Sequence, residues 1–449
     1  MTFEISDGAK YALGKLHLAG YEAYIVGGSI RDMIIGLPVH DYDITTNATP
    51  DKTKEVFSGE LIIETGIKHG TVTLVYDGEN IEITTYRIDG DYKDNRHPDS
   101  VKFTSLLTED LRRRDFTMNA IAYDGKSILV DPFSGKKDIE NKIIRAIGNP
   151  AERFGEDALR ILRGIRFSSV LGFEIERETR TAMTECLDLL DSIARERIAI
   201  EINKFLCGKN VKDAILENYE ILGKIIPEVI KMHGFKQNTK YHIYDVLTHT
   251  AYVVQGVRPV TYMRLAAFLH DTGKVYSYTE DENGTGHFYG HPKESEKIAR
   301  DYLNEYRYDN FTKNKVIALV KEHDNQIQED EVSVKRKLNK FGKEFFTELV
   351  ELQIADNGAQ NPEYLSRKHY EKLLEVSEKI AKESCFTLKS LNVNGSDIIK
   401  LGIPAGKEVG IILSRLLSDV IDGKISNEKE ELEKRATEIA REEHYEIRK

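Results

Sequence analysis

The sequence contains no tryptophan, only three cysteines and no long apolar run. Cys186, Cys207 and Cys385 are scattered and match no metal-binding or disulfide spacing, which favours a reducing cytoplasm. No stretch reaches the roughly 18 apolar residues of a membrane span, and the acidic start, MTFEISDGAK, is not typical of a signal peptide. We therefore expect a soluble, cytoplasmic protein that makes no use of a membrane.

The composition is that of a globular protein with an acidic balance. The 449 residues are 40% hydrophobic and 31% charged, and the formal net charge is −11. A chain of this length is expected to fold into about two to four domains. The net charge argues weakly against nucleic acid as a partner, but it says little about a local basic groove.

The pattern of the sequence changes about a third of the way along. Residues 1–145 combine strand-like runs, such as YEAYIVGG and GTVTLVY, with helical segments. From about Asn149 onward, long amphipathic stretches follow with few strand-like runs. We therefore expect an α+β fold in which a mixed sheet with helices precedes all-α regions.

A glycine turn is predicted in YIVGGSIRD, residues 24–32. A short apolar strand ends at Gly27 and Gly28, and an amphipathic helix follows with Arg31 in its first turns. Backbone N–H groups and the helix dipole at such a turn favour anions, and Arg31 adds a bidentate donor for phosphate oxygens. A plain turn is the alternative for this pattern taken alone.

The next strand, in HDYDITT, carries two carboxylates. Asp41 and Asp43 face the same side of a strand, and Tyr42 faces away. Two carboxylates this close repel each other unless a cation such as Mg²⁺ neutralises them and completes its shell with phosphate oxygens. Glu82, on the strand NIEITTYR, is either a third catalytic carboxylate or an exposed strand residue. A triad would hold two metals for in-line phosphoryl transfer.

Two arginine-rich segments follow. In DLRRRDFTMNAIAYD, the arginines up to Arg114 favour a phosphate and ribose clamp, in which Asp115 accepts from a ribose hydroxyl and Asn119 fixes the loop; a salt-bridge network is the alternative.

In GEDALRILRGIRF, a helix is expected to carry Asp157, Arg160, Arg163 and Arg166 at a spacing of three. Cytosine and adenine each present an amino donor beside a ring-nitrogen acceptor, so an Asp/Arg pair could select them without a template. Uracil and guanine have the opposite pattern and would leave polar groups unpaired.

The order of these motifs resembles that of the bacterial-type (class II) CCA-adding tRNA nucleotidyltransferases, which belong to the polymerase-beta-like nucleotidyltransferase superfamily. The resemblance covers about the first 170 residues and resumes in residues 391–425, which are similar to that family's tail. It implies a head, neck, body and tail. It also implies template-independent addition of CCA to the 3′ end of tRNA from CTP and ATP, with Mg²⁺ as cofactor and release of pyrophosphate.

The resemblance also implies roles for single residues. Asp41 and Asp43 would carry the metals. The residues implied to contact the nucleotide are Gly28, Arg31 and Arg114 at the triphosphate side, Asp157 and Arg160 at the base edge, and Arg163 and Arg166 in the same pocket.

A second constellation of histidines and aspartates lies in the helical part. Its members are His249, His270, Asp271, His291, His323 and Asp356. A buried aspartate needs a partner, and imidazole with carboxylate suits Mn²⁺, Ni²⁺, Co²⁺ or Fe²⁺. The set resembles an HD-domain phosphohydrolase, which implies His249, His270, Asp271 and Asp356 as metal ligands. His291 and His323 would be left for a second metal, and a structural role is the alternative for any single histidine.

Four functional interpretations stay open. CCA addition is favoured. Residues 84–111 resemble a flexible loop that CCA-adding and A-adding members of the family keep and that CC-adding members lack. Addition of A alone is one alternative, and an HD phosphohydrolase with a non-catalytic N-terminal part is another. A non-catalytic RNA-binding protein is the last.

The expected domains follow from these motifs. They are a catalytic head at 1–148, a neck and body with the base-recognition helix at 149–238, an HD domain at 239–360, and a tRNA-binding helical tail at 361–449. Basic segments at 110–115, 158–167, 333–343 and 366–373 are expected to line one face and to contact tRNA.

Overall fold

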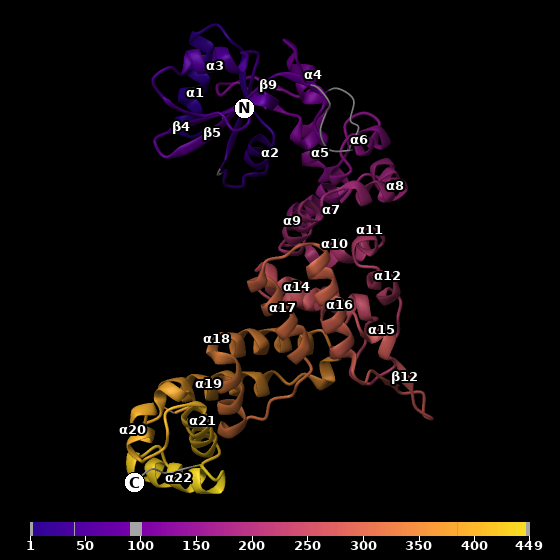
Figure 1. Cartoon of the computed structure of the whole chain (residues 1–449). Helices are drawn as coiled ribbons and strands as arrows, with labels where there is room; N and C mark the ends of the chain where they lie inside the picture. Colours follow the sequence, from indigo (N-terminus) through magenta and orange to yellow (C-terminus); the bar gives the residue numbers. More distant parts are fainter. Residues whose placement is uncertain (1–2, 40, 90–100, 384, 446–449) are drawn as a thin grey trace. The chain divides into compact units, whose positions relative to one another are not determined.

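The computed structural model describes residues 3–39, 41–89, 101–383 and 385–445. The chain forms two compact units (Figure 1). The first comprises residues 1–233 with 301–309, and the second comprises residues 234–300 with 310–449. In the described ranges, no helix is long and apolar enough to cross a membrane.

A seven-stranded sheet forms the centre of the first unit within the described residues. Its order is β3-β4-β5-β2-β1-β8-β9, with β2 and β5 parallel and their other neighbours antiparallel. The predicted mixed sheet with helices is thereby confirmed. The strands are β1 (Ala23–Val26), β2 (Tyr42–Thr46), β3 (Leu61–Ile63), β4 (Thr71–Tyr76), β5 (Glu79–Thr85), β8 (Ala122–Tyr123) and β9 (Leu129–Val130).

One face of this sheet is apolar and packs against a helix, and the other carries carboxylates. Helix α1 (Asp7–Leu18) packs on the face that carries Ile81 and Ile83, and Gly8 of α1 approaches Ile81 closely. Because side chains alternate along a strand, Asp43 and Glu82 point to the opposite face. The carboxylates of Asp43 and Glu82 therefore lie on the face of the sheet away from α1.

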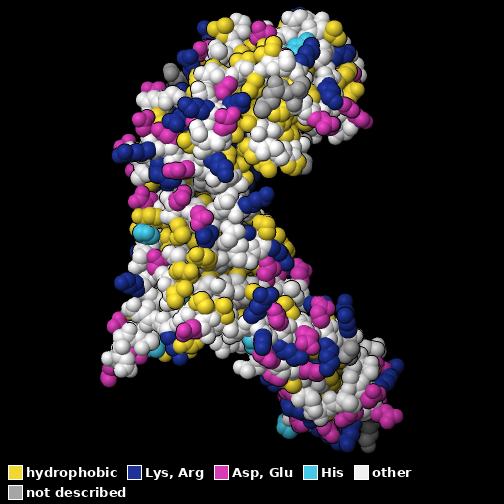
Figure 2. Space-filling model, turned by 180° about the vertical axis from the view of Figure 1, so that it is seen from behind, with side chains coloured by type: hydrophobic (Ala, Val, Ile, Leu, Met, Phe, Trp, Pro, Cys, Tyr) yellow, Lys and Arg dark blue, Asp and Glu magenta, His cyan; other side chains and the backbone are white. Residues whose placement is uncertain are grey.

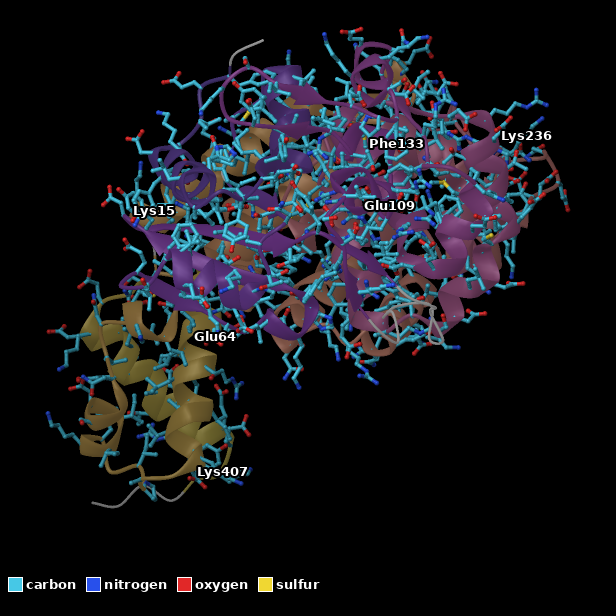
Figure 3. All side chains as sticks on the ribbon, turned by 90° about the horizontal axis from the view of Figure 1, so that it is seen from above. Lys15, Glu64, Glu109, Phe133, Lys236 and Lys407 are labelled. Atoms are coloured by element: carbon cyan, nitrogen blue, oxygen red, sulfur yellow. The ribbon has the colours of Figure 1, made fainter. Side chains whose placement is uncertain are left out.

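Short elements complete the head. They are α2 (Gly28–Ile35), α3 (Pro50–Val56), β6 (Arg87–Asp89), β7 (Val101–Phe103), α4 (Leu107–Arg112), the 3₁₀ turn η2 (Thr117–Asn119), α5 (Gly135–Glu140) and β10 (Ile143–Ile144). Glu109, labelled in Figure 3, marks α4. The loop predicted to be flexible lies partly at residues 90–100, outside the described residues.

Helices follow from Pro150 onward, as the sequence predicted. They are α6 (Pro150–Glu156), α7 (Leu159–Leu171), α8 (Arg177–Glu185), α9 (Arg195–Leu206), α10 (Val211–Glu217), α11 (Tyr219–Ile225) and α12 (Glu228–Met232), with a short strand β11 (Glu174–Ile175) paired to β10. Helix α6 begins where the Asn149 side chain accepts from Ala151 N and Pro150 occupies the first turn.

One local expectation was wrong. Asp157 does not lie on the arginine helix, because its backbone is extended (φ −139°, ψ 101°) and separates α6 from α7. Its carboxylate accepts from Leu159 N at 3.1 Å, as a capping residue does.

Among the described residues of the second unit, the regular elements are helical apart from the small hairpin β12 (Thr279–Glu280) and β13 (Gly286–His287). Its helices before the tail are α13 (Val246–Gly256), α14 (Thr261–Leu269), α15 (Lys274–Ser277), α16 (His291–Glu305), α17 (Asn310–Glu322), α18 (Glu331–Gly358) and α19 (Arg367–Glu383). Helix α16 continues into the first unit at residue 301, and α18 bends at Gly342, whose φ is +80°.

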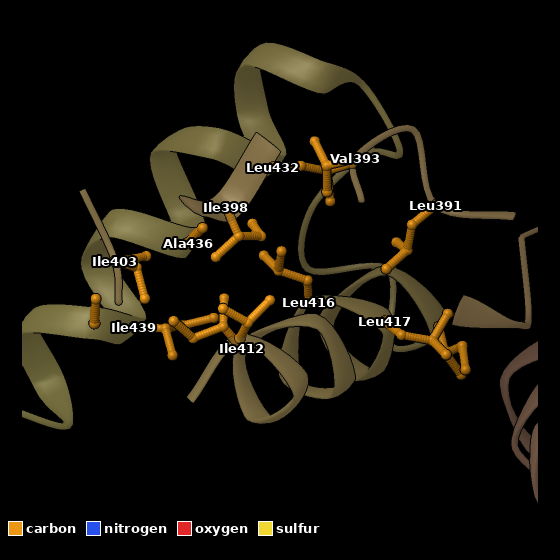
Figure 4. Close-up of a cluster of buried hydrophobic side chains, with 13 residues drawn as sticks. Leu391, Val393, Ile398, Ile403, Ile412, Leu416, Leu417, Leu432, Ala436 and Ile439 are labelled. Atoms are coloured by element: carbon orange, nitrogen blue, oxygen red, sulfur yellow. The ribbon is translucent and has the colours of Figure 1, made fainter. Parts of the chain in front are cut away.

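The C-terminal helices have an apolar core of their own. They are α20 (Gly395–Lys400), α21 (Lys407–Ile421) and α22 (Lys429–Glu442). Ile412 and Leu416 of α21 meet Ile398 of α20 and Ile439 of α22, and all four side chains are fully buried (Figure 4). On the face shown in Figure 2, basic and acidic side chains are interspersed over the surface of the molecule.

Candidate active sites

The first site begins with two carboxylates on neighbouring parallel strands. Asp43 of β2 is in register with Glu82 of β5, so both side chains leave the same face of the sheet. Val26, at the end of β1, pairs with Asp43 on the other side, which brings the glycine turn after β1 to the same place. Asp41 is exposed just before β2, and its backbone carbonyl accepts from the Ser29 hydroxyl at 2.9 Å.

Burial and neighbouring carboxylates raise the pKa of Asp43 and of Glu82. Desolvation raises the pKa of Asp43, Arg114 opposes that rise, and Asp41 adds to it. Desolvation, followed by Asp43 and Asp41, raises the pKa of Glu82. A cluster in which each charge is disfavoured by its neighbours gains from a bound cation, so these residues fit Mg²⁺.

The glycine turn leaves room beside the carboxylates. Gly27 has φ +78° and ψ −140°, a conformation that favours glycine. A Cβ atom there would lie 3.2 Å from Arg114 Nη1 and 3.5 Å from Asp43 Oδ2. Gly28 then begins α2, whose N-terminus points its free N–H groups toward an incoming anion.

A cavity of about 440 Å³ opens at this point. It brings together all eight nucleotide-binding residues predicted from the sequence. Its lining consists of Gly27, Gly28, Arg31, Asp43, Arg113, Arg114, Asp115, Asn119, Asp157, Leu159, Arg160, Arg163, Arg166, Phe167 and Arg197. Asp41 and Glu82 are not in this lining.

A hydrogen-bond network fixes two of the arginines. Arg31 Nη1 donates to Asn119 Oδ1 at 2.9 Å, and Asn119 Nδ2 donates to Asp115 Oδ1 at 2.9 Å. Arg163 Nε in turn donates to Asp115 Oδ2 at 2.8 Å. Burial alone would raise the pKa of Asp115, but Arg163 and Asn119 hold it well below its usual range. Asp115 is therefore a charged link between an arginine of α2 and an arginine of α7.

A second buried carboxylate, that of Asp110 on α4, pairs with the two arginines that directly follow this helix. Asp110 Oδ1 lies 2.9 Å from Arg113 Nη2, and Asp110 Oδ2 accepts from Thr45 Oγ1 at 2.9 Å and lies 3.6 Å from Arg114 Nη2. Burial alone would raise the pKa of Asp110, but Arg113 and Arg114 lower it. Desolvation lowers the pKa of Arg114, and its Nε has no hydrogen-bond partner among the described atoms.

The remaining arginines of α7 also have acidic partners. Arg160 Nη1 donates to Glu156 Oε2 at 2.6 Å, and Arg166 Nε lies 2.9 Å from Glu201 Oε2 on α9. The arginines therefore form both a salt-bridge network and the cavity wall, two alternatives that the sequence had set against each other.

Two residues of the cavity had no part in the sequence prediction. Phe167 has the guanidinium carbons of Arg31, Arg163 and Arg166 at 5.0, 5.6 and 4.2 Å from its ring centre. Arg197 of α9 places Nη2 at 3.3 Å from Asp157 Oδ2. The spacing of Phe167, four residues after Arg163, is a signal that sequence analysis could have used.

The second site lies in the second unit and collects the predicted HD residues. Two groups of potential ligand atoms are present, one formed by His249, His270 and Asp271 and the other by Asp271, His291 and His323. Within each group the ligand atoms lie within 4.8 Å of one another. Asp356 joins them, since its Oδ1 is 2.9 Å from His249 Nε2. Asp41, Asp43 and Glu82 of the head form no such close group within the part of the chain that the structure describes.

The four histidines are oriented alike. Each Nδ1 faces a backbone carbonyl, those of Ala359, Ala267, Phe288 and Val320 for His249, His270, His291 and His323. A carbonyl only accepts, so each Nδ1 donates its proton and each Nε2 presents a lone pair to the centre. His291 Nε2 and His323 Nε2 are 3.2 Å apart. Two lone pairs at that distance repel each other, so the arrangement favours a cation between them.

The carboxylates of this site are held charged. Burial alone would raise the pKa of Asp271, but His270 and Lys274 lower it, and Lys274 Nζ is 2.7 Å from Asp271 Oδ2. His249 likewise lowers the pKa of Asp356 against the effect of burial. His249 Nε2 and His270 Nε2 are buried without a hydrogen-bond partner among the described atoms. Orphaned imidazole nitrogens beside charged carboxylates fit a divalent transition metal.

Two cavities of about 300 and 610 Å³ open onto these ligands. Both are lined by His242, which sequence analysis missed because it lies alone before α13. Desolvation, with Lys274 nearby, lowers the pKa of His242 to about 3, so this imidazole is neutral at physiological pH.

Comparison with protein families gives three matches. The model described as "Poly A polymerase head domain" matches residues 23–145, and that described as "Probable RNA and SrmB- binding site of polymerase A" matches residues 172–232. The model of tRNA nucleotidyltransferase domain 2 matches residues 288–436.

Whole-chain relatives agree with these matches. The chain is 34% identical to the CCA-adding enzyme of Ligilactobacillus salivarius over 443 residues, which cover 96% of each chain. It is 33% identical to the CCA-adding enzyme of Staphylococcus saprophyticus over 452 residues, covering 97% of this chain and 98% of the relative. The solved structure of the Bacillus stearothermophilus CCA-adding enzyme in complex with CTP superposes with a TM-score of 0.73 at 29% identity, covering 98% of this chain and 99% of that one. The Thermotoga maritima CCA-adding enzyme, solved in complex with tRNA, has the same fold (TM-score 0.59, 22% identity, 97% and 96% coverage).

Proposed function

The chain belongs to the family of CCA-adding enzymes, and on that premise we propose that it adds C, C and A to the 3′ end of tRNA without a template. The observation that carries the proposal is that Asp43, which is in register with Glu82 on the neighbouring strand, lines an arginine-rich cavity. CTP and ATP are the nucleotide substrates and tRNA is the acceptor.

The reaction transfers a nucleotidyl group. The 3′ hydroxyl of the RNA attacks the α-phosphorus, a new P–O bond forms, and the bond to the β-phosphate breaks to release pyrophosphate. Asp41 and Asp43, with Glu82 as a third carboxylate, would hold Mg²⁺, which would supply positive charge to the triphosphate and favour deprotonation of the attacking hydroxyl.

Other residues bind and orient the nucleotide. The N-terminus of α2 at Gly28, together with Arg31 and Arg114, binds the triphosphate and helps to neutralise the charge on the leaving pyrophosphate. Asp115 keeps the arginines in position, because its oxygens accept from Asn119 Nδ2 and Arg163 Nε. We also assign it to the ribose hydroxyl of the nucleotide, which would have to share an oxygen with these donors.

Asp157 accepts from the amino group of cytosine or adenine. Arg160, Arg163 and Arg166 belong to the same pocket, with Arg160 assigned to the base edge. We further assign residues 1–148 to the catalytic head, 149–238 to the neck and body, 239–360 to an HD domain, and 361–449 to a tail that binds tRNA.

A gel assay tests the nucleotidyltransferase function. The acceptors are tRNA that lacks its 3′ CCA and tRNA that already ends in CC, supplied with CTP and ATP singly and together. Addition of two C and then A to the first acceptor is expected. Extension of only the CC-ended tRNA, by ATP alone, would instead mean an A-adding enzyme. No extension of either acceptor across a range of Mg²⁺ concentrations would refute both.

The second site favours a second function, phosphoester hydrolysis. The specific observation is the convergence of four Nε2 atoms and two charged carboxylates at the ends of buried helices. His249, His270, Asp271 and Asp356 would hold one divalent transition metal, with His291 and His323 available for a second. Such a metal supplies hydroxide from bound water at neutral pH.

The two functions are separable by mutation. We expect Asp43→Ala to abolish nucleotide addition and to leave hydrolysis of a phosphoester such as p-nitrophenyl phosphate, assayed with Mn²⁺ or Ni²⁺, unchanged. We expect Asp271→Ala to do the reverse. Addition that survives Asp43→Ala would refute the role of that carboxylate, and equal hydrolysis by the wild type and Asp271→Ala would refute the second site.

A further inference from the structure

One histidine of the second site, His323, lies in a turn directly after a helix. It is the first residue past α17, which ends at Glu322. The last carbonyl groups of a helix have no partners within that helix, so such a turn is held in place by bonds from other parts of the chain. Because His323 belongs to the group of ligands available to a second metal ion, the position of this turn matters to that ion.

Gln353 of α18 supplies two bonds of this kind. Its Nε2 donates to His323 O at 2.9 Å and to Asn325 O at 3.0 Å, which uses both hydrogens of the amide group. Gln353 is buried and lies in the wall of the cavity of about 610 Å³. If these donors were lost, the buried carbonyl of His323 would have no partner, which is a costly state.

Gln353 also lies on the helix that carries a ligand of the first metal ion. Asp356 follows it by three residues on α18, so the two side chains leave the same face of the helix. Helix α18 packs against α13, where His249 Nε2 lies 2.9 Å from Asp356 Oδ1. Gln353 therefore connects the turn of His323 to the two helices that supply ligands to the first ion.

The position of the turn decides whether the His323 imidazole faces its partners. Its Nε2 lies 3.2 Å from His291 Nε2 and 3.6 Å from Asp271 Oδ1. The bond from His323 Nδ1 to Val320 O orients the ring on α17, but it does not fix the end of α17 against α18. Bonds that orient a metal ligand from outside are typically worth about 10- to 100-fold in metal affinity.

The fold has a separate connection between these helices. Glu322 lies 3.4 Å from Lys337 Nζ and 3.0 Å from Lys340 Nζ, and both lysines belong to α18. The end of α17 therefore stays attached to α18 without Gln353. What Gln353 adds is the exact position of the backbone at His323.

We propose that Gln353 is a positioning residue for the second metal ion, because it holds the turn in which His323 joins Asp271 and His291 around that ion. The proposal rests on the second function above and adds to it a residue that is not itself a ligand. The ligands assigned to the first ion lie outside this turn. Loss of Gln353 therefore weakens the second ion and spares the first.

Metal binding by the full-length chain tests the proposal. All proteins carry Asp43→Ala, so that the carboxylate site of the head contributes little. Titration calorimetry with Mn²⁺ counts the bound ions, and electron paramagnetic resonance distinguishes a coupled pair of ions from a single one. The parent should bind two ions that couple, because they share Asp271.

Gln353→Met has a side chain of similar length and helix propensity but no N–H group to donate. It should bind the first ion as the parent does and the second about tenfold or more weakly. The spectrum should then be that of a single ion at Mn²⁺ concentrations that give the coupled pair in the parent. Gln353→Leu lacks the same donors and decides the question if Gln353→Met fails to fold.

Gln326→Met is the matched control. Gln326 lines the same cavity just after this turn, but it is exposed and its side chain has no hydrogen bond within the described ranges. This variant should keep both ions. The proposal is overturned if folded Gln353 variants bind the coupled pair with the parent's affinity, if they lose both ions in equal proportion, or if the parent binds only one ion. A parent that binds two ions but hydrolyses no phosphoester would instead refute the second function and leave the role of Gln353 in metal binding intact.

Discussion

At the scale of single residues, Phe167 of α7 is surrounded by arginines of the first cavity. Three arginines from two helices converge on its ring, and Phe116 contacts it edge-on with ring centres 5.9 Å apart. The negative face of the ring moderates the repulsion among the guanidinium groups and sets their spacing. We expect Phe167→Leu to raise KM for CTP and ATP alike by about three- to tenfold, with a smaller change in kcat.

Phe167→Tyr, which keeps an aromatic ring, should restore most of the wild-type KM. Phe173→Leu is a control from the same unit, since Phe173 is equally buried but lies outside the cavity. Steady-state kinetics and a thermal melt of each variant suffice. If the Leu substitutions at both positions raise KM equally, the ring has no special role.

Asp110 gives a prediction about pH. Arg113 and Arg114 hold its pKa below the unfolded value of about 3.9, so its stabilising effect is fully present above that pH and is lost as the pH falls toward the folded pKa. Asp110→Asn leaves two arginines without their buried partner, and we expect a loss of about 3 kcal/mol in the free energy of unfolding at pH 7.

Urea unfolding at pH 7 and at a pH of about 3 measures this effect. The gap between the wild type and Asp110→Asn should narrow at the lower pH, because the wild-type carboxyl group is then protonated in the unfolded chain. Asp188→Asn, which changes a carboxylate that is 96% exposed, should stay within about 1 kcal/mol of the wild type at both values. A gap that is independent of pH would contradict the assignment of charge to Asp110.

The sequence predicted those features whose residues lie close together in one segment of the chain. It did not predict contacts between residues from distant segments. Strand alternation alone predicts that Asp41 and Asp43 share a face, although β2 begins only at Tyr42, and local motifs predict the histidines and aspartates of the second site. The parallel register that sets Glu82 beside Asp43, the pairing of Arg166 with Glu201, and the approach of Arg197 to Asp157 all need tertiary contacts. No periodicity within one segment encodes them.

At the scale of elements, the junction of β1 and α2 lines the first cavity beside Asp43. Gly27→Ala puts a methyl group against Arg114 and Asp43, in a backbone conformation that disfavours any side chain. We expect the affinity for CTP and ATP to fall by about tenfold or more, since the added atom lies where the phosphates approach the turn. Equilibrium binding of each nucleotide to the variant measures this.

Gly36→Ala provides the comparison at the other end of α2. Gly36 also has positive φ, +81°, but nothing lies within 4 Å of the position of a Cβ atom. Both variants should lose stability because of the backbone, by about 1 kcal/mol or more, and only Gly27→Ala should lose nucleotide affinity. Equal loss of affinity in the two would mean that backbone strain, and not the space beside the turn, decides binding.

The break between α6 and α7 shows why local periodicity was not enough at this scale. The three-residue spacing of Arg160, Arg163 and Arg166 correctly predicted a helix, but Asp157 continues the same spacing and is not part of it. The extended backbone at Asp157 turns its carboxylate toward Arg197 of α9, so the break serves the arrangement of the cavity. Spacing alone cannot distinguish a helical residue from one that caps the helix.

At the scale of the whole molecule, the net charge of −11 has to be reconciled with an RNA substrate. The basic residues of the head cavity and of residues 333–343 already have acidic partners, as in the pairs Arg163–Asp115 and Lys340–Glu322. Binding of tRNA therefore depends on local basic groups that attract the phosphates, while the neighbouring carboxylates repel them. Such binding is sensitive to screening by salt.

We expect the affinity for tRNA to fall by about a hundredfold or more between roughly 50 and 200 mM salt, the decrease for four or more phosphate contacts. Filter binding with the inactive Asp43→Ala variant measures this without turnover, and a duplicate series with that variant and CTP alone separates the contribution of the nucleotide cavity. If the affinity for tRNA decreases more steeply with salt concentration than the affinity for CTP does, the protein makes contacts along the RNA backbone. An affinity for tRNA that stays flat across this range would contradict recognition through phosphates and would place the binding energy in base and shape contacts instead.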